Sequence, residues 1–335
     1  MTDKKPRIAF IGTGGTISFE GRDSLDLWEY MDHGTQIGVS EILAHFPEVG
    51  NTVDIVPFDF RVVESTDLSP TDWRELTEKI HEVDKSSDSV DGIVVTHGTA
   101  SLEETAYFLH LTVKTARPVV VIGAQRPSSG FATDAGSNLL AAVRTAASAE
   151  ARGLGVVTIL NEEIQCAREV TKGSTLRLEA FRSPDLGMLG YADPDGTIAI
   201  YRKPARPHTS ATEFDLSQVG EFPRVDIVAS YAGADGTAID AAVAAGANAV
   251  VISAFAPGIV TPAQREALDR ALAKDVRIII SSRAGSGRII QRATMRQRGI
   301  IGADNLNPQK ARVLAILALT QSTDPVEIQR MFDTY

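Results

Sequence analysis

Short runs rich in valine and isoleucine alternate along this chain with longer amphipathic segments, and this alternation restricts the fold more than any other feature. Such runs are typical of strands buried on both faces, whereas the longer segments repeat apolar residues at helical spacing. Strands are predicted at residues 7–11, 92–95, 119–122 and 156–160, and helices at 71–84, 102–114 and 138–149. Residues 187–201 differ, because short alternating segments flank the turn signal Asp195-Gly196 and predict a hairpin. The order predicts an α/β fold with a mainly parallel sheet.

A second set of alternating strands and helices follows a segment of different composition. Residues 203–222 are rich in proline, serine and threonine and lack an apolar period, which is typical of a linker. Beyond it, strands are predicted at 225–230, 249–253 and 277–281, and helices at 238–245, 262–273, 308–320 and 325–332. Because 335 residues exceed one ordinary core, we expect two α/β domains. The larger, catalytic one spans 1–202, the linker 203–222, and the smaller C-terminal one 223–335.

Charge and cysteine content exclude several classes of partner. The net charge of −10 repels phosphate backbones and anionic lipid, so we expect neither nucleic acid nor membrane as a partner. Cys166 is the only cysteine, which rules out an intrachain disulfide and a cysteine metal site. The apolar run at 7–11 is too short for a signal peptide and predicts a first strand. A cytoplasmic location is therefore the default expectation.

The first predicted strand leads into the glycine-rich turn Gly12–Ile17, with the sequence GTGGTI. In open parallel sheets ligands bind beyond the carboxyl ends of the strands, so this turn is a candidate site. It lacks the last glycine of the dinucleotide fingerprint and no helical pattern follows it, which disfavours a nucleotide. Its glycines can expose backbone amides to a developing negative charge, with Thr16 facing the ligand. The alternative is a turn whose threonines only satisfy backbone groups.

A second polar turn, Thr96–Ser101 with the sequence THGTAS, follows the strand at 92–95. Ser101 lies three residues before Glu104, a spacing that predicts a capping box at the start of a helix. Thr99 would then lie at the strand-to-helix corner near free helix amides, or would be no more than a cap residue. His97 could be a catalytic base, but beside a packed strand end we expect a structural histidine.

Lys172, at the end of the run REVTK, is a candidate base. An isolated lysine is usually solvated on the surface. It would accept a proton only if the fold placed it beside Thr99, where burial would lower its pKa. Sequence spacing alone leaves both interpretations open.

Together these segments resemble the bacterial asparaginase/glutaminase family, and its type II branch most closely. The family has a TGGTI-type turn and an HGTD-type turn that leads into a helix. Further similarities lie in GAQRPS at 123–128, in PAR and HTS between 204 and 210, and in LNPQKAR at 306–312. The resemblance runs in order from about residue 7 to the end of the chain.

The resemblance implies roles for individual residues. The nucleophile would be Thr16, with Tyr30 on the following loop helping to activate it, and Thr99 would pair with Lys172. The implied substrate-binding residues are Gly15, Ser65, Thr66, Gly98 and Ala100, with Ser65 holding a carboxylate. The reaction would be acyl transfer, in which a hydroxyl attacks an amide, ammonia leaves and water cleaves the acyl-enzyme. Neither a metal nor an organic cofactor is required.

The chain departs from the family where the α-ammonium group of the substrate is held. The aspartate of the HGTD turn is replaced by Ala100, and the glutamine after the carboxylate-binding serine by Thr66. A glutamate and an asparagine that a neighbouring subunit contributes align near Thr294 and near Pro257-Gly258. Burying an ammonium group without a carboxylate is costly, so these changes indicate a substrate that lacks the group.

Three functions remain open. We favour a hydrolase acting on a small carboxylate-bearing amide, lactam or lactone without an α-ammonium group. The second is a true L-asparaginase or glutaminase in which Asp67 or Glu104 compensates for Ala100. The third is a catalytically inactive protein that binds a small acid, which the retention of the catalytic threonines and the lysine disfavours. The family pattern further implies a homotetramer of close dimers, and a mobile lid over residues 19–34.

Overall fold

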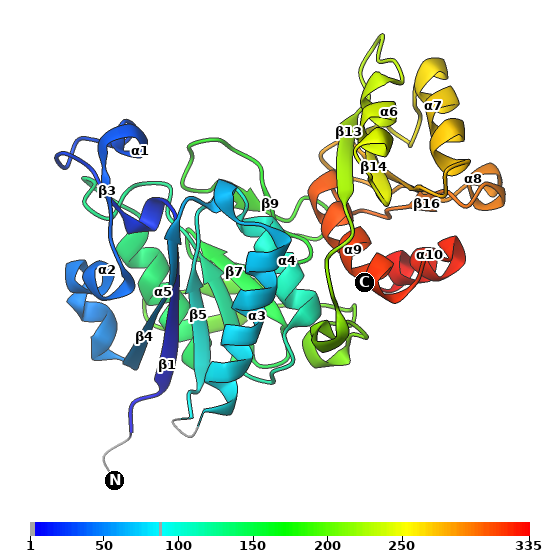
Figure 1. The fold of residues 1–335 in the computed structure, drawn as a ribbon. Coiled ribbons are helices and arrows are strands. Elements are labelled where there is room, and N and C mark those ends of the chain that lie inside the picture. Colours follow the sequence, from blue (N-terminus) through cyan, green and yellow to red (C-terminus); the bar gives the residue numbers. More distant parts are fainter. Residues whose placement is uncertain (1–3, 87–88) are drawn as a thin grey trace. The chain divides into compact units, whose positions relative to one another are not determined.

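The structure is a computed structural model that describes residues 4–86 and 89–335. The chain divides into two compact units, Met1–Thr212 and Glu213–Tyr335. The division falls inside residues 203–222, the segment expected to be a linker. Each unit has its own sheet and its own layers of helices (Figure 1).

The N-terminal unit is built on an eight-stranded sheet of order β12-β11-β8-β7-β6-β5-β1-β4. The neighbours from β7 to β4 in this order run parallel, whereas β7-β8, β8-β11 and β11-β12 are antiparallel. The strands are β1 (Arg7–Gly14), β4 (Asp54–Val63), β5 (Gly92–Thr96), β6 (Val119–Ile122), β7 (Val156–Leu160), β8 (Glu163–Cys166), β11 (Gly190–Ala192) and β12 (Ile198–Ile200). The predicted α/β class with a mainly parallel sheet is confirmed, as is the hairpin, whose register pairs Ala192 with Ile198.

Helices cover both faces of this sheet because successive strand residues point to opposite sides. Ile8 and Phe10 of β1 pack in a core under α2 (Val39–His45) and α5 (Ala135–Ala147). Ala9 and Ile11 pack on the other face, under α3 (Pro70–Lys85) and α4 (Leu102–Thr112) (Figure 1). All four strand residues are fully buried, which explains why this strand reads as a continuous apolar run.

The sequence did not predict β4, the edge strand of the sheet. Its ten residues include Asp54, Asp59 and Arg61, and none of them is fully buried. A strand with one hydrogen-bonded neighbour tolerates charge, and also Pro57, which lies opposite Phe10. Because β4 is an edge strand, it lacks the continuous apolar run from which the central strands were predicted.

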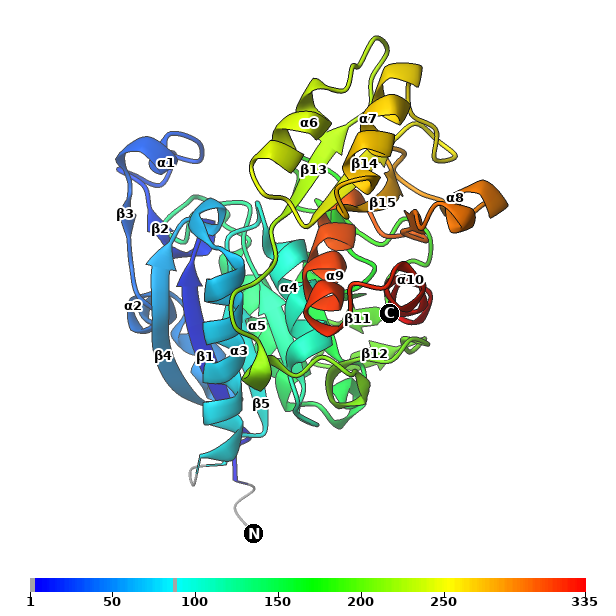
Figure 2. The ribbon, with the colours of Figure 1, turned by 45° about the vertical axis from the view of Figure 1, so that its right-hand side comes forward.

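Short elements complete the N-terminal unit. They are η1 (Thr16–Ser18), β2 (Phe19–Glu20), α1 (Tyr30–His33), β3 (Thr35–Gln36), η2 (Pro47–Asn51), η3 (Ser65–Asp67), η4 (Ala149–Ala151), β9 (Thr171–Lys172), β10 (Phe181–Arg182) and η5 (Thr209–Ala211). Strands β2 and β3 pair with each other, and so do β9 and β10. The segment containing α1 lies beyond the carboxyl ends of β1 and β4 (Figures 1 and 2).

The C-terminal unit has a four-stranded parallel sheet in sequential order. Its strands are β13 (Val225–Ala229), β14 (Ala249–Ala254), β15 (Arg277–Ser282) and β16 (Ile301–Gly302), and its helices are η6 (Leu216–Gln218), α6 (Thr237–Ala244), α7 (Pro262–Leu272), α8 (Ala293–Gln297), α9 (Pro308–Gln321) and α10 (Pro325–Thr334) (Figure 2). The sequence predicted most of these elements but not β16 or α8, which are too short to show a period. Among the residues that the structure describes, no helix is long and apolar enough to cross a membrane.

Candidate active site

Three turns that follow parallel strands meet at the carboxyl-terminal edge of the larger sheet. They follow β1, β4 and β5, and they contain Gly15, Ser65 and Gly98 respectively. A Cβ atom on Gly15 would lie 2.1 Å from Gly98 Cα, and one on Gly98 would lie 2.7 Å from Ser65 Oγ. Gly15 also has a φ of +84°, a conformation that side chains disfavour. Only glycine at both positions allows the three turns to pack this closely.

Hydrogen bonds fix the three turns to one another. Thr13 Oγ1 donates to the Thr96 carbonyl (2.8 Å), which joins the ends of β1 and β5. The Gly15 N–H donates to the Val63 carbonyl (3.1 Å), which joins the first turn to β4. The amide of Gly15 is therefore already used, and the expectation that the glycine turn presents consecutive free amides is wrong at this residue.

Ser101 does not form the predicted capping box. It occupies the position before α4, but its Oγ donates to the Ser65 carbonyl (2.6 Å), and within the described structure its side chain makes no capping bond. A tertiary contact thus replaces the local one. Since Ser101 is the N-cap residue of α4, Thr99 is not. The interpretation that Thr99 serves only as a helix cap is therefore excluded.

Two hydroxyl pairs lie at this junction of turns. Thr16 Oγ1 and Tyr30 Oη are 3.0 Å apart, a hydrogen bond in which either atom can donate. Lys172 Nζ donates to Thr99 Oγ1 over 2.8 Å. Lys172 reaches this place because β9 pairs with β10, where it lies opposite Phe181. The condition under which Lys172 could act as a base, contact with Thr99, is met.

The two partners of the threonines respond oppositely to burial. Burial raises the pKa of the Tyr30 phenol, and the hydrogen bond to Thr16 opposes part of that rise. Burial lowers the pKa of the Lys172 ammonium. Both shifts disfavour the charged form, because a desolvated charge loses its hydration. Lys172 therefore becomes neutral at a lower pH than an ordinary lysine, whereas Tyr30 keeps its phenol proton to a higher pH than an ordinary tyrosine.

A cavity of about 480 Å³ opens above the two pairs. Every residue predicted for the site lines it: Gly15, Thr16, Tyr30, Ser65, Thr66, Gly98, Thr99, Ala100 and Lys172. The remaining lining residues are Phe19, Leu27, Trp28, Met31, Glu64, Gln125, Thr175 and Leu176. The structure thus brings together residues that are far apart in the sequence, and all of them belong to the N-terminal unit.

Glu64 is the residue of the cavity that sequence reasoning missed. Among the described residues that line the cavity, it is the only carboxylate, and Lys172 is the only cation. Asp67 and Glu104, the acids expected to compensate for Ala100, are not among those lining residues. Glu64 directly precedes Ser65 at the end of β4, so an assignment of that strand would have pointed to it.

Asp134 holds the segment that follows β6 against the cavity. Its carboxylate accepts hydrogen bonds from the Gln125 N–H (2.9 Å), the Arg126 N–H (3.0 Å) and Asn138 Nδ2 (3.1 Å). The N–H and the Oγ of Ser128 both donate to the Phe19 carbonyl, each over 3.0 Å. These bonds tie the GAQRPS turn to the base of the segment that carries Tyr30.

His97 lies beneath the cavity and does not line it. Its side chain is fully buried, and Nδ1 donates to the Gly98 carbonyl over 2.8 Å. Burial lowers its pKa to about 4, and the bond to Gly98 opposes only part of that shift. A neutral ring that holds the turn supports the expectation of a structural histidine.

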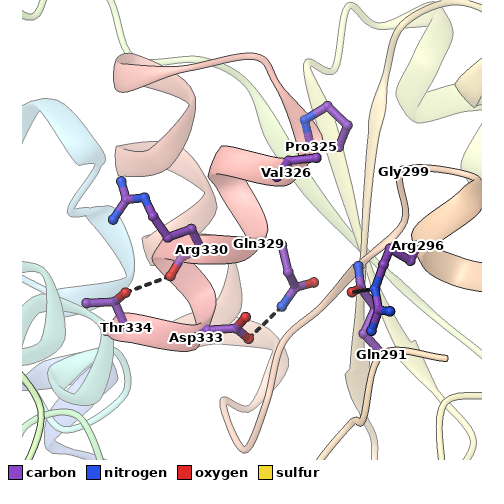
Figure 3. A pocket seen from close by; sticks show the side chains of 9 residues that line it. All are labelled: Gln291, Arg296, Gly299, Pro325, Val326, Gln329, Arg330, Asp333 and Thr334. Carbon is purple, nitrogen blue, oxygen red and sulfur yellow. Dashed lines mark hydrogen bonds between the residues drawn. The ribbon is translucent and has the colours of Figure 1, made fainter. Parts of the chain in front are cut away.

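A second cavity, of about 410 Å³, lies within the C-terminal unit (Figure 3). Its polar side chains bond to their neighbours: Gln329 Nε2 donates to Asp333 Oδ1 (2.9 Å), and Arg296 Nε donates to Gln291 Oε1 (3.3 Å). It contains no nucleophile paired with a base among the described residues. Across the described chain, no group of three or more His, Cys, Asp or Glu side chains is arranged to hold a metal.

The C-terminal unit brings together the two segments that align with the family's neighbouring-subunit residues. Thr294 lies in the first turn of α8, whose preceding residue, Arg292, donates from Nη2 to the Gly258 carbonyl (3.1 Å). The loop at residues 257–258 is therefore bonded to the residue that precedes α8.

Comparison with known proteins assigns the family. The model of the asparaginase N-terminal domain matches residues 7–206, and that of the glutaminase/asparaginase C-terminal domain matches residues 224–332. The chain belongs to the asparaginase/glutaminase family and is an amidohydrolase. The expected family, fold and enzyme class are confirmed.

Individual relatives cover nearly the whole chain. It is 38% identical to L-asparaginase 2 of Escherichia coli (98% of this chain, 93% of the relative) and 37% identical to L-asparaginase 2 of Bacillus subtilis (98% and 87%). It is 36% identical to the glutaminase-asparaginase of Pseudomonas fluorescens (99% and 91%). The crystal structure of a "Probable Cytoplasmic L-asparaginase" from Campylobacter jejuni superposes with a TM-score of 0.94, at 36% identity, over 99% of this chain and 100% of that one.

Proposed function

We propose that this enzyme hydrolyses a small carboxylate-bearing amide, or a lactam or lactone, that lacks an α-ammonium group. The observation that carries the proposal is the position of Ala100. It lines the cavity directly after Thr99, whose hydroxyl contacts Lys172. A methyl group at this place cannot pair with an ammonium group, so the charge-assisted hydrogen bond that a carboxylate would form here is missing.

The two hydroxyl pairs support a two-step acyl transfer. Thr16 Oγ1 attacks the carbonyl carbon while its proton passes toward Tyr30 Oη, 3.0 Å away. The C–N bond breaks, ammonia leaves with the proton, and an ester with Thr16 remains. Water then attacks this ester, and its proton moves through the Thr99 hydroxyl to the neutral amine of Lys172. The C–O bond to Thr16 breaks, the acid is released, and Thr16 Oγ1 takes up the proton that Lys172 gives back through solvent, so that both the hydroxyl and the neutral amine are restored.

Ser65 is the residue that we assign to the substrate carboxylate. It lies in the turn after β4, is almost fully buried, and its own carbonyl is fixed by Ser101. A hydroxyl held in this way is pre-organised for an anionic acceptor and loses little freedom on binding. Thr66, next in the turn, lines the same cavity and can donate a second hydrogen bond.

Glu64 favours a second candidate, a true L-asparaginase or glutaminase. Its carboxylate lines the cavity, so it can pair with the α-ammonium group of the substrate. It would do so from the turn after β4, whereas Ala100 lies in the turn after β5. Several relatives are named L-asparaginases or glutaminase-asparaginases. In this alternative, the carboxylate that pairs with the α-ammonium group comes from Glu64 instead of residue 100, and the substrate is still asparagine or glutamine.

A pair of substrates separates the two candidates. Succinamic acid is L-asparagine without the amino group, so the ratio of their kcat/KM values reports recognition of that group alone. We expect the wild type to prefer succinamic acid, or a carboxylated lactone, and to have a KM for L-asparagine in the millimolar range or above. Ala100→Asp should shift the ratio toward asparagine by about ten- to a hundredfold, since it restores a charge-assisted hydrogen bond.

Glu64→Gln completes the experiment, with Glu78→Gln on the exposed face of α3 as its control. If the proposal is right, neither change alters the preference between the two substrates by more than a few fold. A micromolar KM for L-asparagine that is lost in Glu64→Gln only, without turnover of succinamic acid, would establish the second candidate instead.

A further inference from the structure

Large apolar side chains gather at the mouth of the active-site cavity. Phe19, Leu27, Trp28 and Met31 come from the segment around α1, and Leu176 comes from the loop between β9 and β10. Trp28 is 59% exposed, Met31 46% and Leu176 60%, although all line the same cavity. Exposed apolar side chains that share one concavity mark a binding surface more strongly than scattered ones do.

The segment that carries these side chains is held in a defined conformation. The Gly21 N–H donates to Ser129 Oγ (2.8 Å), and the Phe131 N–H donates to the Ser24 carbonyl (2.6 Å). Arg22 forms an ion pair with Glu29 (2.6 Å). The rings of Phe19 and Tyr30 pack with their centroids 5.4 Å apart. These contacts hold the segment beside the Thr16–Tyr30 pair.

The cavity is larger than its polar part requires. Its polar side chains, which are the two hydroxyl pairs, Ser65, Thr66, Glu64, Gln125 and Thr175, suffice for one amide and one carboxylate. Its volume of about 480 Å³ lies in the range of about 300–1,000 Å³ that accommodates ligands of many atoms. The apolar side chains line the remainder.

We propose that Phe19, Leu27, Trp28, Met31 and Leu176 form a subsite for an apolar substituent of the substrate. The substrate is then an amide or lactone that carries an aryl or branched alkyl group in addition to its carboxylate. This inference rests on the proposed hydrolysis at Thr16, and it adds no chemical step to it. The substituent lies either on the acyl part of the substrate or on the leaving amine. Two substituted substrates, one of each kind, distinguish these possibilities.

Trp28 allows binding to be measured without catalysis. The chain has two tryptophans, and the other, Trp73, is 3% exposed and packs against Phe108. In a Trp73→Phe background all tryptophan emission comes from Trp28. We expect phenylsuccinate to shift this emission to the blue and to quench it at a lower concentration than succinate does. Succinate, which has the carboxylates alone, should leave the wavelength of the emission unchanged.

Hydrolysis supplies the second measurement. We compare N-benzylsuccinamic acid and 2-phenylsuccinamic acid, which carry the apolar group on the leaving and the acyl side, with unsubstituted succinamic acid. One of the two should have a kcat/KM at least roughly tenfold higher than succinamic acid. Leu176→Gln should reduce that ratio at least roughly tenfold. Leu186→Gln, at a leucine that is 54% exposed and outside the cavity, is the matched control and should leave the ratio unchanged.

Two results would overturn the subsite. The first is equal quenching by phenylsuccinate and succinate, and the second is a ratio near one that Leu176→Gln does not change. The same substituents on L-asparagine test the proposed function separately. If the apolar substituents increased kcat/KM only in the asparagine series, the substrate would carry an α-ammonium group. That result would refute the proposed function and would still support the subsite.

Discussion

At the scale of residues, the site contains two threonines whose surroundings differ in one decisive respect. Thr16 contacts a phenol whose pKa is raised by burial, and Thr99 contacts an amine whose pKa is lowered by burial. A phenol with a raised pKa keeps its proton and can relay one without ionising, and an amine with a lowered pKa is more readily neutral and so free to accept one. This difference is the reason that we propose attack at Thr16 and water activation at the Thr99–Lys172 pair.

If both pairs take part in turnover, neither threonine hydroxyl can be dispensed with. Thr16→Ala and Thr99→Ala should each lower kcat about a thousandfold or more, measured with the best substrate. Thr145→Ala, at a buried threonine of α5 outside the cavity, controls for the loss of a buried hydroxyl. A near-normal kcat in either site variant would remove that threonine from the mechanism.

The lowered pKa of Lys172 predicts a particular pH dependence. The amine accepts a proton only when neutral, and it acts in the second step, so kcat should rise with pH through the pKa of Lys172, which burial places below its ordinary value of 10.5. Ala100→Asp adds an opposite charge beside the Thr99–Lys172 pair, which favours the ammonium form and raises that pKa. The rising limb of the pH profile should therefore move to higher pH.

Ala100→Asn is the matched control for this shift, because it has almost the same shape without the charge. The profile is best recorded with succinamic acid, so that recognition of an amino group does not enter. If Ala100→Asp leaves the rising limb in place, Lys172 is not the group that titrates.

At the scale of elements, the site depends on how closely the turns after β1, β4 and β5 approach. A Cβ on Gly98 would lie 2.7 Å from Ser65 Oγ and 2.8 Å from Ser65 Cβ, so Gly98→Ala must displace Ser65. We expect kcat/KM for a carboxylate-bearing substrate to fall about a hundredfold, on the scale of a small misplacement of a binding group. Gly50→Ala, where nothing lies within 4 Å, should have no such effect. Equal kinetics in both variants would show that the contact does not position Ser65.

The segment over residues 19–34 is the second element with a testable role. It is folded, with β2 paired to β3 and α1 carrying Tyr30, and its mobility remains a prediction. If it closes over bound substrate, amide hydrogen exchange between Phe19 and Gly34 should slow when succinate is added. Equal protection with and without succinate would contradict a gating role.

The elements that sequence reasoning found, and those it missed, differ in their burial. Strands β5, β6 and β7 are buried along their whole length and read as apolar runs, so they were predicted closely. Strand β4 lies at the edge, and with it Glu64 was missed. The contact between Lys172 and Thr99 joins residues 73 apart, and it depends on the short pair β9-β10, for which the sequence has no signal. Family resemblance, not periodicity, located the residues of the site.

At the scale of the whole molecule, the remaining question is whether one chain forms a complete site. All residues that line the cavity belong to the N-terminal unit, whereas family resemblance implies residues from the C-terminal unit of a neighbouring subunit. The aligned segments at 257–258 and around Thr294 do lie together, joined by the bond from Arg292 to Gly258. A surface assembled in this way suits a role in closing the site of another copy.

We therefore predict that the active form is a homotetramer of close dimers with shared sites. Sedimentation at assay concentration should show no active monomer. Thr16→Ala removes the nucleophile, and Thr294→Arg places a bulky charge on the closing surface, so we expect each variant to be nearly inactive alone. If one chain closes the site of its partner in a symmetric dimer, co-expression leaves one intact site in every mixed dimer, and about a quarter of the wild-type activity should return. Thr16→Ala co-expressed with Lys172→Met is the control, because both changes affect the same unit and their mixture has no intact site. Activity in a sedimenting monomer, or no recovery in the mixed sample, would show instead that each chain works alone.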